Sequence, residues 1–347
     1  MFKKSKKVLL IMLSLILVTT MAGCGKNTDE KKPAESKTEE KQTSKEEKPA
    51  DKKSYNIDVI LKTTASEYWS YVQAGALAYM KDHPEVKVEV KGATSETAYD
   101  EQQNMIETDL NSGAYDGLVI SPLQADLVKN LIAGKTMPIV AVDTQIEAPE
   151  VLSFVGTSNE EAAKEGGLAA VKMAKERGWD KIQAIAISGV QGDGTATARL
   201  EGYKAGINEA GGEFLEGEIQ YADAVADKAV TSMEAIMQNH PEGIAVICAN
   251  NDDMAMAAAR AAKDNPAYAK TVFVGFDGIQ SACNAILADE ETMSVAQQGY
   301  EMGYKSVEAV VKALNGETLE KFINSGVSII TKENAQERLD TLKGYIK

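Results

Sequence analysis

From Tyr55 to the C-terminus, short apolar segments alternate with longer segments that place apolar residues at helical spacing. This alternation predicts parallel strands joined by right-handed helical crossovers. About ten strands are too many for one comfortable twisted sheet. We therefore expect an α/β fold of two Rossmann-like, doubly wound lobes. The predicted strands are 55–61, 86–90, 115–120, 137–142, 181–187, 214–220, 243–249, 272–276 and 293–296.

Polar and aromatic side chains follow many of these strands. Open parallel sheets bind ligands beyond the carboxyl ends of their strands, so these side chains form the candidate site. In the first half of the chain they are Lys62, Ser66, Tyr68, Trp69, Ser121, Asp143 and Thr144. In the second half they are Arg199, Asn251, Asp277 and Gln297.

These residue types favour a neutral polyhydroxyl ligand. Asp143 and Asp277 accept hydrogen bonds and Arg199 donates them, while the aromatic residues offer flat faces to the C–H groups of a ring. Acidic residues at strand ends also cap helices. We assign that second role to Asp252 and Asp253, which open a predicted helix over 252–263.

Three segments of the second half resemble the signature segments of type I periplasmic sugar-binding proteins, a group that includes ribose and galactose binders. They are Ala249-Asn-Asn-Asp-Asp-Met-Ala-Met-Ala-Ala258, Val274-Gly-Phe-Asp-Gly278 and Val295-Ala-Gln-Gln298. The resemblance extends over residues 55–347. It implies an N-terminal lobe of residues 55–157 and 298–325 and a C-terminal lobe of residues 158–297 and 326–347. The three crossovers would lie near Thr157, Gln298 and Gly326.

The resemblance also implies a function. A sugar or polyol would bind between the lobes and pass to the permease of an ABC transporter, without catalysis or a cofactor. The ligand contacts carried across from the family are Asp143, Arg199, Asn251, Asp277 and Gln297 for hydrogen bonds, with Tyr68 and Trp69 as aromatic contacts. Two alternatives stay open: a receptor that presents a sugar or furanosyl signal to a membrane sensor, and a surface carbohydrate-active enzyme.

The chain departs from the ribose-type pattern at several of these positions. Thr144 stands where that pattern has arginine, and Ser66 and Ser121 stand where it has asparagine. Ala224 replaces an aromatic residue of the second lobe. Lys62 replaces a small polar residue, and some binders of furanosyl signals carry lysine there. These departures put ribose in doubt as the ligand.

The N-terminus predicts membrane attachment. Four lysines precede a short apolar run, and Met21-Ala-Gly-Cys24 follows, which resembles a bacterial lipobox with Met in place of Leu. We expect residues 1–23 to be a lipoprotein signal peptide and Cys24 to carry lipid. Residues 24–54 are rich in charge and poor in apolar groups, which is typical of a disordered tether. The expected location is the extracytoplasmic face of the cell membrane.

Composition excludes several other functions. The net charge of −15 argues against nucleic acid binding, which needs basic patches. Cys248 and Cys283 have apolar neighbours, which favours two buried thiols over the alternative of a disulfide between them, while His83 and His240 precede prolines as turn residues. No cluster has the ligand spacing of a metal site. The Gly192-Asp-Gly-Thr-Ala-Thr segment lacks the third glycine of a dinucleotide loop. We expect no metal, no cofactor and a monomer.

Overall fold

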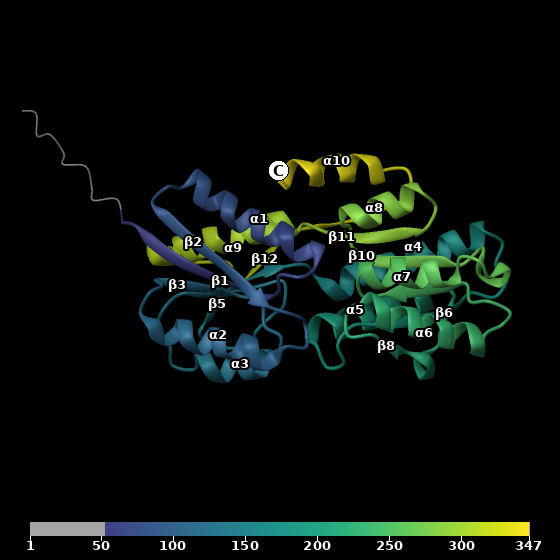
Figure 1. The fold of residues 1–347 in the computed structure, drawn as a ribbon, viewed down its shortest axis with the longest axis horizontal. Helices are drawn as coiled ribbons and strands as arrows, with labels where there is room; N and C mark the ends of the chain where they lie inside the picture. Colours follow the sequence, from purple (N-terminus) through teal and green to yellow (C-terminus); the bar gives the residue numbers. More distant parts are fainter. Residues whose placement is uncertain (1–52, 347) are drawn as a thin grey trace, which may run out of the picture. The chain divides into compact units, whose positions relative to one another are not determined.

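The computed structural model describes residues 53–346. The predicted signal peptide, Cys24 and almost all of the predicted tether lie outside the described residues. Figure 1 shows two lobes, each built on a mainly parallel sheet with helices on both faces. This architecture confirms the α/β fold that the alternating sequence predicts. Within residues 53–346, no helix combines the length and the hydropathy that crossing a bilayer requires.

The first lobe contains a parallel sheet with the strand order β12-β5-β4-β3-β1-β2. Helices α1 (Glu67–Asp82) and α9 (Gly299–Leu314) pack on one face, and α2 (Tyr99–Ser112) and α3 (Ala125–Ile132) on the other. The strands are β1 (Tyr55–Thr63), β2 (Val86–Ala93), β3 (Gly117–Ile120), β4 (Ile139–Val142), β5 (Val151–Gly156) and β12 (Phe322–Asn324).

The second lobe contains a sheet with the strand order β13-β11-β10-β9-β6-β7, with β8 also paired to β6. Its strands are β6 (Gln183–Ser188), β7 (Glu213–Phe214), β8 (Gln220–Tyr221), β9 (Val246–Ala249), β10 (Val272–Asp277), β11 (Met293–Gln297) and β13 (Val327–Ile330). Only β13 among these described strands runs antiparallel, beside β11. The helices are α4 (Asn159–Glu176), α5 (Gly194–Glu209), α6 (Ala226–Asn239), α7 (Asp252–Ala262), α8 (Gln280–Leu287) and α10 (Ala335–Tyr345).

The strands of the second sheet are buried on both faces. Along β6, Ala184 and Ala186 face the core formed with α4 and α5, while Ile185 and Ile187 face the core formed with α6 and α7. Such double burial explains why parallel strands read as continuous apolar runs. The doubly wound arrangement leaves the carboxyl ends of the strands free to form a site.

The chain passes between the lobes three times, after β5, after β11 and after β12. Hydrogen bonds fix two of these passages in place. Ser325, on the third passage, donates its backbone N–H to the Gly156 carbonyl at 2.8 Å. Arg338 of α10 donates to the Gln297 carbonyl at 2.6 Å and to Oε1 of Gln298 at 2.8 Å, at the second passage. The lobes are therefore joined by a braced, hydrogen-bonded hinge.

Two details differ from the sequence-based expectations. The predicted strand 214–220 is wrong as one element, because a 3-10 turn at Glu216–Glu218 separates β7 from β8. Strands β5, β12 and β13 were not among the predicted ones. Cys248 and Cys283 are free and buried, which confirms the expected pair of buried thiols.

Candidate functional site

The carboxyl ends of strands from both sheets meet at a cavity between the lobes. Its volume is about 50 Å³. One buried water needs about 10–15 Å³, so with the lobes as they stand here the cavity has space for only about three to five waters, and a ligand needs the lobes to move apart to enter. Six of its lining residues have ionisable side chains: Lys62, Glu96, Asp143, Asp193, Arg199 and Asp277.

Asp143 anchors the wall that the first lobe provides. It follows β4 with a φ of 63°, a left-handed conformation that aspartate tolerates better than most residues. Its side chain accepts a hydrogen bond from the Tyr68 hydroxyl at 2.9 Å and one from Thr144 Oγ1 at 3.0 Å. The carboxylate is thus held at the cavity by neutral donors, and no cation lies in direct contact with it among the described residues.

The aromatic residues of α1 lie beside this carboxylate. The rings of Tyr68 and Trp69 meet edge to face, with 5.1 Å between their centroids. Trp69 donates its indole N–H to Glu96 at 3.2 Å. Burial raises the pKa of the Glu96 carboxyl, although Lys62 opposes that effect. The first lobe therefore contributes aromatic surface and two acidic groups.

Arg199 anchors the opposite wall. Its guanidinium donates to Oδ1 of Asn159 at 2.8 Å and to the Asn250 carbonyl at 2.6 Å, and it stacks on the Phe276 ring at 3.8 Å. It also lies 3.6 Å from the carboxylate of Asp277. These contacts hold the guanidinium in one orientation at the cavity wall.

Close packing of α4 against α5 fixes the position of Arg199. A Cβ atom on Gly202 would lie 2.2 Å from the Glu160 carbonyl oxygen, and one on Gly206 would lie 2.1 Å from that of Lys164. Only glycine permits such close approach of two helix backbones. The spacing of these glycines therefore sets how deeply α5 enters the interface between the lobes.

Asp277 ends β10 in a strained conformation. Its φ of 118° is unusual for any residue other than glycine, and such strain often marks functional positions. Gln297 donates to Oδ1 of Asp277 at 2.8 Å. Burial raises the pKa of Asp277 well above its ordinary value, while the Arg199 guanidinium opposes that shift.

An ion pair crosses directly between the lobes. Nζ of Lys62, in β1, lies 2.6 Å from Oδ2 of Asp193, and their side chains are only 4% and 9% exposed. Burial by itself would lower the pKa of Lys62, but Asp193, Glu96 and Asp143 together raise it. Asp193 also caps α5, since its Oδ1 accepts from the Ala196 N–H at 2.8 Å. The pair therefore links β1 of one lobe to a helix of the other.

Most of the residues predicted for the site come together here. Eight of them line the cavity: Lys62, Ser66, Tyr68, Trp69, Asp143, Arg199, Asn251 and Asp277. Gln297 does not line the cavity, but its side-chain amide donates a hydrogen bond to Asp277, which does. Thr144 faces an adjoining groove. Ser121 is buried outside the cavity lining, and its hydroxyl has no hydrogen-bond partner among the described residues.

The sequence-based assignment of caps at α7 needs correction. Asn251, not Asp252, is the N-cap, because its side chain accepts from the Met254 N–H at 2.9 Å. Asp252 is fully buried and accepts from the Ser294 hydroxyl and the Ile279 N–H. Burial raises the pKa of Asp252 to about 7. Asn251 thus both caps the helix and faces the cavity.

Glu96 and Asp193 are lining residues that the sequence reading did not single out. Glu96 follows β2, and Asp193 follows β6 within the segment that was weighed as a dinucleotide loop. Both obey the rule that ligands bind beyond strand ends. Applying that rule to every predicted strand would have found them.

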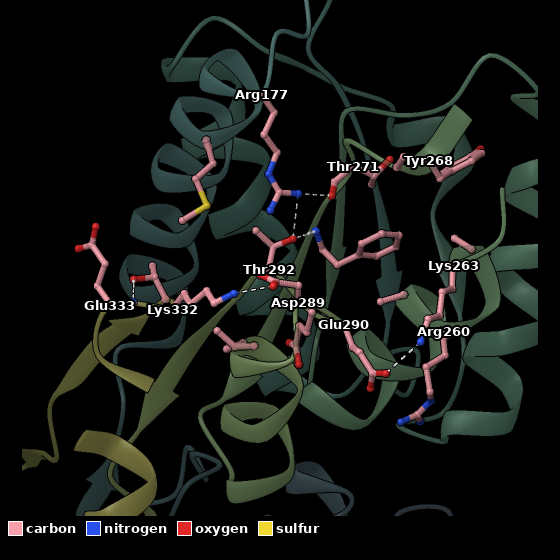
Figure 2. A pocket seen from close by; sticks show the side chains of 18 residues that line it. Arg177, Arg260, Lys263, Tyr268, Thr271, Asp289, Glu290, Thr292, Lys332 and Glu333 are labelled. Atoms are coloured by element: carbon pink, nitrogen blue, oxygen red, sulfur yellow. Dashed lines mark hydrogen bonds and ion pairs between the residues drawn. The ribbon is translucent and has the colours of Figure 1, made fainter. Parts of the chain in front are cut away.

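A second cavity, of about 450 Å³, lies in the second lobe (Figure 2). Several of its charged side chains already have partners. Lys263 pairs with Glu290 at 3.1 Å, Lys332 pairs with Asp289, and Arg177 donates to the Thr271 carbonyl at 2.7 Å. This cavity takes no residue from the first lobe, so lobe movement would not enclose a ligand there. No group of acidic, histidine or cysteine residues within 53–346 is arranged to hold a metal ion.

Comparisons with known proteins agree with this geometry. The sequence profile of the periplasmic binding protein domain family matches residues 57–318. The chain therefore belongs to this family. It is 26% identical over 295 residues to the ribose import binding protein of Bacillus subtilis, covering 84% of this chain and 92% of the relative.

Solved structures show the same likeness. A carbohydrate transporter solute binding protein from Agrobacterium radiobacter, in complex with D-arabinose, has a TM-score of 0.76 and 25% identity, covering 85% of this chain and 99% of that one. An ABC transporter solute binding protein from Agrobacterium vitis, with bound D-fucose, has a TM-score of 0.72 and 27% identity, covering 83% and 98%. Family and fold together define a two-lobed solute-binding protein.

Proposed function

We propose that this protein is the extracytoplasmic solute-binding component of an ABC transporter and that it binds a sugar or sugar-like polyol between its lobes. The relatives named above bind or import sugars. The observation that carries the proposal is the cavity itself, where Asp143 and Arg199 from opposite lobes face one space beside two aromatic rings. The protein delivers its ligand to a permease and catalyses no reaction.

The charges of the cavity narrow the ligand class. Four carboxyl groups and two basic side chains line it. Both basic side chains already have an acidic partner, because Lys62 pairs with Asp193 and Arg199 lies against Asp277. A ligand with its own carboxylate or phosphate would be repelled, since buried like charges are unfavourable. The ligand is therefore a neutral sugar or polyol whose hydroxyls donate to Asp143 and Asp277 and accept from Arg199.

Ligand capture works by closing the lobes about the three passages. A ligand that contacts both walls stabilises the closed state by its difference in affinity for the closed and open states. The proposed boundaries are those of the sequence analysis, with residues 55–157 and 298–325 in one lobe and 158–297 and 326–347 in the other. The permease then recognises the closed form.

A thermal-shift screen tests the proposal. A ligand at about 100 times its dissociation constant adds about 2.7 kcal/mol of stability. Pentoses, hexoses and inositols should include at least one stabilising compound, whereas the matching uronates and sugar phosphates should stabilise less. A screen in which no neutral sugar or polyol stabilises the protein, at millimolar concentration, contradicts the proposal.

Attachment to the membrane is part of the same proposal. Cys24 lies outside the described residues, so its support is the lipobox-like sequence Met21-Ala-Gly-Cys24 and the charged segment that follows. A lipid on Cys24 would hold the folded part at the extracytoplasmic surface, near its permease, while the tether lets the lobes reach that partner.

A further inference from the structure

A larger groove adjoins the cavity between the lobes. The groove has a volume of about 780 Å³ and is lined from the first lobe by the segment after β4 and from the second lobe by the first turns of α4 and α5. Asp143 and Thr195 line both the cavity and the groove. The two spaces are therefore neighbours on either side of the same residues.

A contact between two threonine hydroxyls lies at the boundary of the two spaces. Oγ1 of Thr144 and Oγ1 of Thr195 lie 2.8 Å apart and come from opposite lobes. Because the two hydroxyls belong to different lobes, any opening movement pulls them apart and joins the cavity to the groove. A ligand that enters the open cleft can then lie across both spaces, and a ligand hydroxyl or glycosidic oxygen can replace the direct contact between the threonines.

The groove offers the surface that a second sugar ring needs. Phe322 is 39% exposed, and its ring stacks on Phe154 with 5.4 Å between centroids. Glu160, Glu161 and Lys321 also line the groove, and no hydrogen bond or ion pair engages their charged groups among the described residues. An aromatic platform beside unengaged donors and acceptors matches the C–H faces and hydroxyls of a sugar.

We propose that the groove is a second subsite and that the natural ligand is a disaccharide or a glycoside, with one ring in the cavity and the rest of the molecule in the groove. This inference rests on the proposed sugar-binding function. The cavity is only about 50 Å³ in volume, whereas the adjoining groove, at about 780 Å³, has space for a further ring. The ligand class is thus set by both spaces together.

Calorimetry with matched sugars tests the inference. The probes are D-glucose, D-galactose and D-xylose, each beside a β-1,4-linked disaccharide that contains it: cellobiose, lactose and xylobiose. At least one disaccharide should bind about tenfold or more tightly than its monosaccharide. Phe322→Ala should remove about tenfold of that disaccharide affinity, the worth of one aromatic contact, and leave monosaccharide affinity unchanged. Ala198→Trp should fill the groove and have the same selective effect.

Tyr221→Ala is the control, because Tyr221 is a 43% exposed aromatic residue that lines neither space. The second subsite would be overturned if the monosaccharides bound as tightly as the disaccharides, or if neither Phe322→Ala nor Ala198→Trp changed disaccharide affinity. The proposed sugar-binding function would stand in either case. Absence of binding by these six sugars together with every neutral sugar and polyol of the thermal-shift screen would instead contradict the proposed function and with it this inference.

Discussion

The ion pair between Lys62 and Asp193 should hold the lobes together even without ligand. The two atoms lie 2.6 Å apart with side chains that are 4% and 9% exposed. Breaking a buried pair from one side typically costs about 3–5 kcal/mol. Glu96 and Asp143 still face Lys62 after Asp193→Asn, so we expect a smaller cost of about 2–3 kcal/mol to the closed state. In the open state both groups return to water, and the cost there is near zero.

That difference lowers the ratio of closed to open molecules by about 30- to 140-fold. Small-angle X-ray scattering of the unliganded protein should therefore give a larger radius of gyration for Asp193→Asn than for the wild type. Asp223→Asn is the matched control, because the pair of Asp223 with Lys228 lies within the second lobe. If Asp193→Asn and the wild type scatter identically without ligand, the pair does not govern closure and the reasoning fails.

Three further predictions concern the site, the buried core and the anchor. Arg199→Ala and Asp277→Asn should each weaken binding of the ligand found in the screen by about 5- to 150-fold, or about 1–3 kcal/mol, with Asp253→Ala near normal by calorimetry. Burial raises the pKa of Glu291 well above 4.5. Folding therefore favours the protonated form of Glu291. Between its pKa in the unfolded chain, about 4.5, and its higher pKa in the folded protein, the free energy of unfolding decreases as the pH rises, by up to about 1.4 kcal/mol per pH unit. Glu291→Gln should reduce the decrease in the free energy of unfolding between pH 5 and pH 8, measured by urea melts at each pH. An unchanged decrease would disprove the raised pKa of Glu291. Cys24→Ser should release the protein from membranes in detergent-free fractionation, and full retention of the variant would refute lipid anchoring.

The main features of the fold could be predicted because they depend on local patterns. Segments such as 272–276 are continuously apolar and are buried on both faces, so their position in a parallel sheet follows from composition. The edge strands were harder. β12 is three residues long and its pattern is mostly exposed, so its pairing with β5 depends on tertiary contact rather than on its own sequence.

The site was predicted to the extent that strand ends define it. Asp143 and Asp277 follow apolar strands directly, and the structure places both at the cavity. The partners of these residues were not predictable. The contact between Lys62 and Asp193 joins positions 131 residues apart, and it exists only because two separate lobes meet. Likewise, the capping role of Asn251 depends on where α7 starts, which sequence patterns locate only to within a few residues.

A crystal structure of the protein with the tightest-binding sugar of the screen tests the central claim most directly. The account predicts the sugar between the lobes, with hydroxyls within hydrogen-bond distance of Asp143, Arg199 and Asp277 and a ring face against Tyr68 or Trp69. A sugar bound instead in the cavity of Figure 2, with the space between the lobes filled only by water, would contradict it.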